Sequence, residues 1–158
     1  MRNYLSRCVL RNHAGIRPPD SRRNSEMYLL DTDTIIYFLK NDPVVVDNFR
    51  LNEDAPKALS VITYGELLYG AENSARRNEN LARIHRIAEL FPVIDVTRAV
   101  METLSSVKFS LKRSGRTVGD FDLVIASTAI TIGYSVVTNN QRHFDKISGL
   151  NTANWKNK

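Results

Sequence analysis

Three acidic side chains stand where a short apolar run gives way to a helical pattern. Asp31 follows an apolar run at residues 28–30, Glu66 follows one at 58–62, and Asp122 opens a helical pattern at 120–132. Carboxylate oxygens without Cys or His partners suit hard cations such as Mg²⁺ or Mn²⁺ rather than zinc. The three histidines of the chain show no ligand spacing. This combination favours metal-assisted hydrolysis of phosphoesters.

Asp31 and Glu66 each have a purely structural interpretation as well. Asp31 is a good helix N-cap, although three other capping residues follow within one turn. Thr63 and Glu66 have the Thr-x-x-Glu spacing of a capping box. Gly70, one turn after Glu66, costs about 1 kcal/mol in a helix relative to alanine. We interpret that glycine as leaving open space beside the Glu66 carboxylate.

Two further polar clusters accompany these acids. Asp120 and Asp122 lie two residues apart, and Asp120 is the better candidate for the helix cap, which would leave Asp122 free. Neighbouring carboxylates repel each other, and a bound divalent cation would relieve that repulsion. Asn139 and Asn140 end the apolar run 135–138, where they could ligate a cation, hold water or simply form a turn.

Other common chemistries lack their motifs. The sequence contains no Gly-x-x-x-x-Gly-Lys-Ser/Thr loop, no Gly-x-Gly-x-x-Gly and no Gly-x-Ser-x-Gly. The single cysteine, Cys8, cannot form an internal disulfide, which fits a reducing, cytoplasmic setting. No apolar run reaches the roughly 18 residues that would cross a membrane, so we expect no membrane association.

The elements that must position these residues alternate along the chain. Apolar runs predict strands at residues 27–31, 58–62, 92–96 and 135–138, with a short edge strand at 151–155. Helical spacing predicts helices at 32–40, 43–51, 63–73, 80–90, 98–114, 120–132 and 141–146. The alternation predicts an α/β fold, an α/β/α sandwich around a mostly parallel sheet of four to five short strands. Ligands bind such sheets beyond the carboxyl ends of the strands.

The positive charge of the chain is concentrated at its beginning. Residues 1–26 hold six arginines and two acids, whereas residues 27–158 carry a net charge of only +1. We expect residues 1–26 to be a disordered basic extension and residues 27–158 to be one domain. The extension could be a transit peptide or an RNA-binding arm. We favour translation from Met27, because that residue opens the first strand directly.

Four segments together resemble a known family. They are Tyr-Leu-Leu-Asp-Thr-Asp-Thr-Ile-Ile at 28–36, Ser-Val-Ile-Thr-Tyr-Gly-Glu-Leu-Leu-Tyr-Gly-Ala at 60–71, Gly-Asp-Phe-Asp-Leu-Val-Ile-Ala at 119–126 and Val-Val-Thr-Asn-Asn-Gln-Arg-His-Phe at 136–144. In this order and spacing they resemble PIN-domain ribonucleases, specifically the VapC-type toxins of type II toxin–antitoxin pairs. The resemblance runs from residue 27 to residue 155.

The resemblance implies a site. Asp31, Glu66 and Asp122 would be its acidic residues, with Asp31 and Asp122 as ligands of Mg²⁺, for which Mn²⁺ could substitute. Glu66 would orient or deprotonate the attacking water, or hold the metal through a water molecule. The fourth position of the family, often Asp, falls on Asn140, which weakens any second metal site. Asp120 would either compensate for Asn140 or cap its helix.

The resemblance also implies a Mg²⁺-dependent endoribonuclease acting on tRNA or rRNA, leaving a 5′-phosphate and a 3′-hydroxyl. It implies inhibition by a VapB-type antitoxin and a homodimer. Four cations near the acidic segments are candidates for binding the RNA backbone, with solvated surface charge as the alternative: Lys112, Arg113, Arg116 and Arg142. Two rival interpretations are a flap-type DNA nuclease and a binding module that has lost catalysis.

Overall fold

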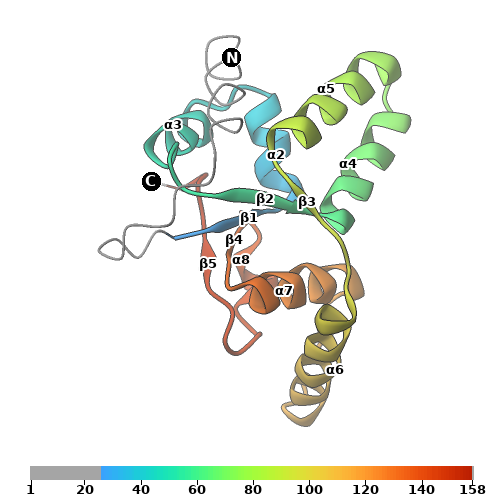
Figure 1. Cartoon of the computed structure of the whole chain (residues 1–158), viewed down its shortest axis with the longest axis vertical. Coiled ribbons are helices and arrows are strands. Elements are labelled where there is room, and N and C mark those ends of the chain that lie inside the picture. The colour runs from blue at the N-terminus through green and yellow to red at the C-terminus, as the bar shows by residue number, and fades with distance from the viewer. Residues whose placement is uncertain (1–25, 158) are drawn as a thin grey trace.

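The computed structural model describes residues 26–157 (Figure 1). The strands are β1 (Tyr28–Leu30), β2 (Lys57–Ser60), β3 (Val93–Ile94), β4 (Ser135–Val137) and β5 (Thr152–Ala153). The helices are α2 (Thr32–Leu39), α3 (Pro43–Leu51), α4 (Val61–Glu72), α5 (Arg77–Leu90), α6 (Arg98–Arg113), α7 (Asp120–Ile132) and α8 (Gln141–Phe144). The basic extension predicted at residues 1–26 lies, except for Glu26, outside the described residues.

The five strands form one sheet in the order β3-β2-β1-β4-β5, and every neighbouring pair is parallel. In the centre of the sheet Leu30 pairs with Leu59 on one side and with Val137 on the other. The carboxyl ends of β2, β1 and β4 therefore lie next to one another. The prediction of a mostly parallel sheet of four to five short strands is confirmed.

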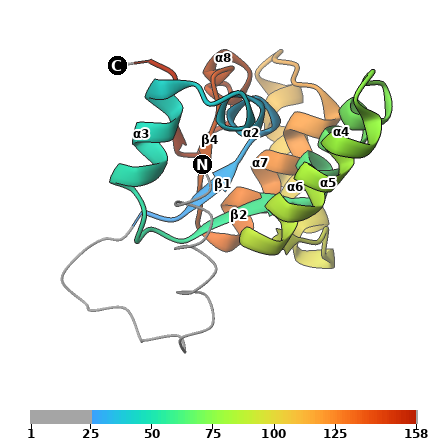
Figure 2. The same ribbon diagram turned by 90° about the horizontal axis from the view of Figure 1, so that it is seen from above.

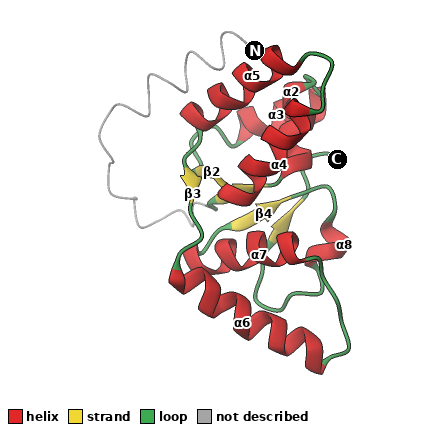
Figure 3. Ribbon diagram, turned by 90° about the vertical axis from the view of Figure 1, so that its right-hand side faces the viewer, coloured by secondary structure: helices red, strands yellow, loops and turns green. Residues whose placement is uncertain are grey.

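Helices cover both faces of this sheet, as Figures 1 and 3 show. Successive strand residues point to opposite faces. Leu30 and Val137 pack with α2 to α5, whereas Leu29 and Val136 pack with α6 to α8. Seen from above in Figure 2, α4 and α5 lie side by side. The predicted α/β/α sandwich is confirmed. Within residues 26–157 no helix has the length and apolarity that crossing a membrane requires.

The predicted helix start at residue 63 is wrong, and so is the alternative interpretation of Thr63 and Glu66 as a capping box. The helix begins two residues earlier, and Ser60, the last residue of β2, is its N-cap, accepting a hydrogen bond from the Thr63 backbone N–H at 2.9 Å. Strand and helix thus meet without a loop. Because Thr63 is already inside the first turn, Glu66 lies in the second turn and has no capping role.

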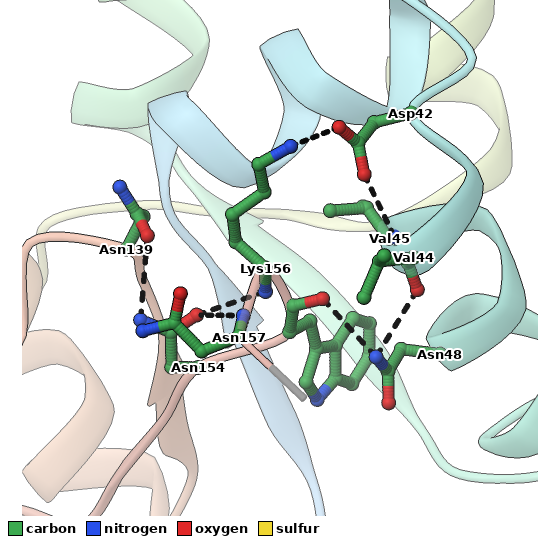
Figure 4. A network of polar contacts seen from close by, with 9 residues as sticks. Asp42, Val44, Val45, Asn48, Asn139, Asn154, Lys156 and Asn157 are labelled. Atoms are coloured by element: carbon green, nitrogen blue, oxygen red, sulfur yellow. Dashed lines mark hydrogen bonds and ion pairs between the residues drawn. The ribbon is translucent and has the colours of Figure 1, made fainter.

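The C-terminal segment packs against the layer that contains α2 and α3 and forms polar contacts with residues at the start of α3 (Figure 4). Trp155 is buried and meets the rings of Tyr28 and Phe49 edge-on, with centroid distances of 5.0 Å to each. Lys156 forms an ion pair with Asp42, the N-cap of α3. These contacts anchor the chain just after β5. Because β5 is the last strand in the sheet order and pairs with β4, the predicted edge strand is confirmed.

Candidate active site

Asp31 lies at the junction of β1 and α2. Its carboxylate accepts hydrogen bonds from the Thr32 backbone N–H and the Thr138 hydroxyl, each at 2.8 Å. The residue is only 9% exposed. Burial raises the pKa of the Asp31 carboxyl from 3.8 to about 6, against the lowering effect of these two donors, and the charges of Asp33 and Glu66 raise it further. Asp31 is thus a cap and also a buried acid whose negative charge is only partly compensated.

Glu66 reaches the same region from α4. Its Oε2 accepts a hydrogen bond from the Thr32 hydroxyl at 2.5 Å. Glu66 and Gly70 line a cavity of about 410 Å³ between α2, α4 and α5. A Cβ atom added at Gly70 would meet nothing within 4 Å. The open space predicted beside Glu66 is therefore confirmed.

Asp122 occupies the first turn of α7. Its Oδ2 lies 3.0 Å from the Nδ1 of His143 on α8. Gly119 is the N-cap of α7, and no side chain caps the helix. The prediction that Asp120 is the cap is wrong. The exposed Asp120 carboxylate instead forms an ion pair with Lys108 of α6, at 2.7 Å. Asp122 is nevertheless free of a capping role, as predicted.

Asn140 follows the end of β4. Its backbone N–H donates to the Thr138 hydroxyl at 3.0 Å, and its side-chain amide Nδ2 lies 2.8 Å from His143 Nδ1. Thr138 in turn donates to Asp31. A continuous path of close polar contacts therefore runs from Asp31 through Thr138, Asn140 and His143 to Asp122. Asn140 is a link in this path as well as a candidate ligand.

The four predicted site residues thus converge on one edge of the sheet, beyond the carboxyl ends of its central strands. Asp31 and Glu66 are electrostatic neighbours, whereas Asp122 is joined to Asp31 through the path. Within the described part of the chain, no three His, Cys, Asp or Glu side chains form a ready-made metal cage. The donor chemistry fits Mg²⁺, which keeps several waters and commonly binds through one or two carboxylates.

Sequence reasoning missed three polar residues of this region. Thr138 connects Asp31 to Asn140. Asp33, considered only as a cap, accepts a hydrogen bond from the Asn139 backbone N–H, which lies between its two carboxylate oxygens at 3.0 and 3.2 Å. Burial raises the pKa of Asp33. His143 was set aside because the histidines lack ligand spacing, although its position three residues after Asn140 on a helix could have indicated proximity.

The four cations proposed to bind the RNA backbone are all exposed. Arg142 donates from Nε to Asn140 Oδ1 at 3.2 Å and so lies at the site itself. Arg116 donates to the Lys146 carbonyl at 3.4 Å. Their role toward RNA stays a prediction.

Known proteins are similar to this chain in sequence and fold. The PIN domain family matches residues 28–150. The tRNA(fMet)-specific endonuclease VapC of Shigella flexneri is 38% identical over 129 residues, which are 81% of this chain and 97% of that protein. The DNA-bound VapBC of Salmonella typhimurium is 35% identical with a TM-score of 0.76, over 82% of this chain and 98% of that chain.

A second solved structure, VapBC2 of Rickettsia felis bound to a DNA fragment from its promoter, has the same TM-score of 0.76 at 28% identity. It matches 82% of this chain and 98% of that chain. The fold, the order of the site segments and this similarity along nearly the full length of the relatives agree. The chain therefore belongs to the PIN-domain family and, within it, to the VapC-type ribonucleases.

Proposed function

We propose that this protein is a Mg²⁺-dependent endoribonuclease that acts as the toxin of a toxin–antitoxin pair. The observation that carries the proposal is the path of polar contacts that joins Asp31 to Asp122, with Glu66 beside it. Three carboxylates gathered at one edge of a sheet repel each other, and a divalent cation is the simplest partner for them. The VapC ribonucleases that this chain resembles supply the reaction class.

Each side chain has a distinct task in this proposal. Asp31 and Asp122 would hold Mg²⁺, which when bound neutralises phosphate charge and acidifies water. Glu66 would take the proton of the attacking water, since the Thr32 hydroxyl fixes its Oε2 and leaves Oε1 available. Asn140 would orient water through its amide. Together they hydrolyse a phosphodiester bond.

The substrate we propose is RNA, specifically tRNA or rRNA. The support is the Shigella relative, which is named a tRNA(fMet)-specific endonuclease. The test incubates purified protein with total RNA or with duplex and flap DNA in Mg²⁺, followed by mapping of the cleaved ends. We expect discrete cuts in RNA with 5′-phosphate ends. Cleavage of flap DNA alone would replace this proposal with the DNA-nuclease alternative.

The partner we propose is a VapB-type antitoxin, because the solved structures that match this chain include VapBC complexes. The cavity beside Glu66 is a suitable place for an inhibitory peptide. Its lining combines the apolar Ile36, Leu67 and Ile84 with the cations Arg76 and Arg83. Both arginines already form ion pairs with Glu79, so the lining favours a peptide with apolar side chains.

Co-expression with the product of the neighbouring short reading frame tests this partnership. We expect that protein to co-purify with the chain and to abolish RNA cleavage. Growth arrest on expression of the chain alone, relieved by co-expression, is the cellular counterpart. Equal arrest by an Asp31→Ala variant would contradict the catalytic interpretation. Light scattering of the purified protein tests the proposed homodimer.

A further inference from the structure

His143 lies between two of the proposed site residues. Its Nδ1 is 3.0 Å from Asp122 Oδ2 and 2.8 Å from Asn140 Nδ2. The ring is presented by α8, a single turn whose last residue, Phe144, is buried at 1% exposure in the core beneath α7. Because Phe144 anchors α8, the neighbouring imidazole is held against Asp122.

Nδ1 of His143 cannot form the same kind of hydrogen bond with Asp122 and with Asn140. A neutral Nδ1 either donates a proton or accepts one, whereas an ionised carboxylate can only accept. A hydrogen bond to ionised Asp122 therefore requires the proton on Nδ1. Asn140 can adapt to that state by rotating its amide to present an oxygen instead of an NH₂ group, at the expense of the hydrogen bond that its Oδ1 accepts from Arg142.

We infer that His143 is a positioning residue that fixes the Asp122 carboxylate by donating from Nδ1 to Oδ2, leaving Oδ1 to face a divalent cation; this inference rests on the proposed function. Among the described residues 26–157, His143 is the hydrogen-bond partner of the Asp122 carboxylate. Asp31, by contrast, is fixed by two donors. Without His143 the carboxylate would rotate freely about its side-chain torsions.

The expected loss of metal affinity on removal of His143 can be judged from other metal sites. Carboxylate ligands are commonly held by hydrogen bonds from neighbouring groups, and loss of such a group lowers metal affinity by about 10- to 100-fold. We therefore expect a His143→Leu variant to bind Mn²⁺ at least about tenfold more weakly than the wild type. His143→Asn keeps an N–H donor at the position of Nδ1 and should restore most of the affinity.

The experiment measures Mn²⁺ binding from the EPR signal of the free ion, on purified protein without RNA. Thermal unfolding in EDTA accompanies it, and we expect both variants to melt near the wild type. In the nuclease assay His143→Leu should need more Mg²⁺ for half-maximal rate and recover most of the rate at saturation. A residue with only a structural role would instead lower the melting temperature, without rescue by metal.

A matched control removes a histidine ring outside the proposed site. His85 is exposed on α5 and contacts Tyr64, away from the acidic residues, so His85→Leu should leave Mn²⁺ affinity unchanged. Wild-type affinity in His143→Leu, or equal loss in His143→Asn, would overturn the inference. Wild-type affinity in Asp31→Asn would instead refute the proposed metal site, so the two failures are distinguishable.

Discussion

Replacement of Asp31 by Asn should stabilise the metal-free protein at neutral pH. The Asp31 carboxyl is 9% exposed, and its pKa rises from 3.8 to about 6 on folding. The folded state therefore binds the proton more tightly than the unfolded state. Ionised Asp31 destabilises the fold above about pH 6, and this penalty disappears as the pH falls toward 3.8.

The size of the effect follows from that shift. A difference of roughly 2 pKa units corresponds to roughly 3 kcal/mol at pH 7, at about 1.4 kcal/mol per unit. The Asn variant loses one acceptor, because its NH₂ group would face the Thr138 hydroxyl, which now donates to Asp31. That loss costs about 1 kcal/mol. We therefore expect a net gain of about 2 kcal/mol in the free energy of unfolding.

Urea unfolding in EDTA at several values between pH 4 and pH 8 measures this gain. The advantage of the Asn variant should be largest at pH 7 to 8 and should be lost between about pH 5 and pH 4, where the cost of the lost acceptor, about 1 kcal/mol, exceeds the remaining penalty of ionised Asp31. The exposed Asp120, replaced by Asn, is the control and should shift stability by less than about 0.5 kcal/mol. A difference between Asp31→Asn and wild type that does not change with pH, or an Asn variant less stable at pH 8, would refute the reasoning.

Three further predictions concern groups around the site. Thr32→Val removes the hydroxyl that donates to Glu66, so kcat for RNA should fall about tenfold, the equivalent of one hydrogen bond; an unchanged kcat would contradict this. Gly70→Ala should raise the free energy of unfolding by up to about 1 kcal/mol. Gly70→Leu, whose side chain fills the cavity, should weaken antitoxin binding in a titration. Antitoxin binding equal to that of the wild type would show that the inhibitory peptide binds outside this cavity. Lys156→Met removes the ion pair with Asp42 and the contact 4.7 Å from the Tyr37 ring, so carboxypeptidase should trim the C-terminus faster than in the wild type; equal trimming rates would argue that Trp155 alone anchors the segment.

Divalent cations offer a complementary test of Asp31. A ligand that binds only the folded state stabilises it by an amount that grows with the logarithm of its concentration above Kd, about 1.4 kcal/mol at ten times Kd. Mg²⁺ should therefore stabilise the wild type and leave Asp31→Asn unchanged. Equal stabilisation of both proteins by Mg²⁺ would place the cation elsewhere.

Local sequence signals were sufficient for most of the fold. The bounds of α3 and α7 agree with the prediction to the residue, because Asp42-Pro43 marks one start and Gly133, with a φ of +73°, marks one end. The start of α5 was placed three residues late. Its N-cap is Arg76, which makes no side-chain capping bond, so no capping signal marks the position.

The parts of the site that could not be predicted depend on partners distant in sequence. Asp120 has the composition of a cap, but Lys108 on α6 attracts its carboxylate instead. His143 contacts Asp122 only because α8 packs beside α7. Asp31, in contrast, was identified from its place at the end of β1, since strand-end position is a local property. A local sequence pattern does not show which distant residue will compete with the helix end for a polar side chain.

The most direct test of the account is RNA cleavage by the wild type and by Asp122→Asn, each in Mg²⁺ and in EDTA. The account predicts cleavage by the wild type in Mg²⁺, none in EDTA, restoration by Mn²⁺, and a loss of at least about a hundredfold in the variant. Cleavage that persists in EDTA, or an Asp122→Asn variant that cuts at the wild-type rate, would contradict it.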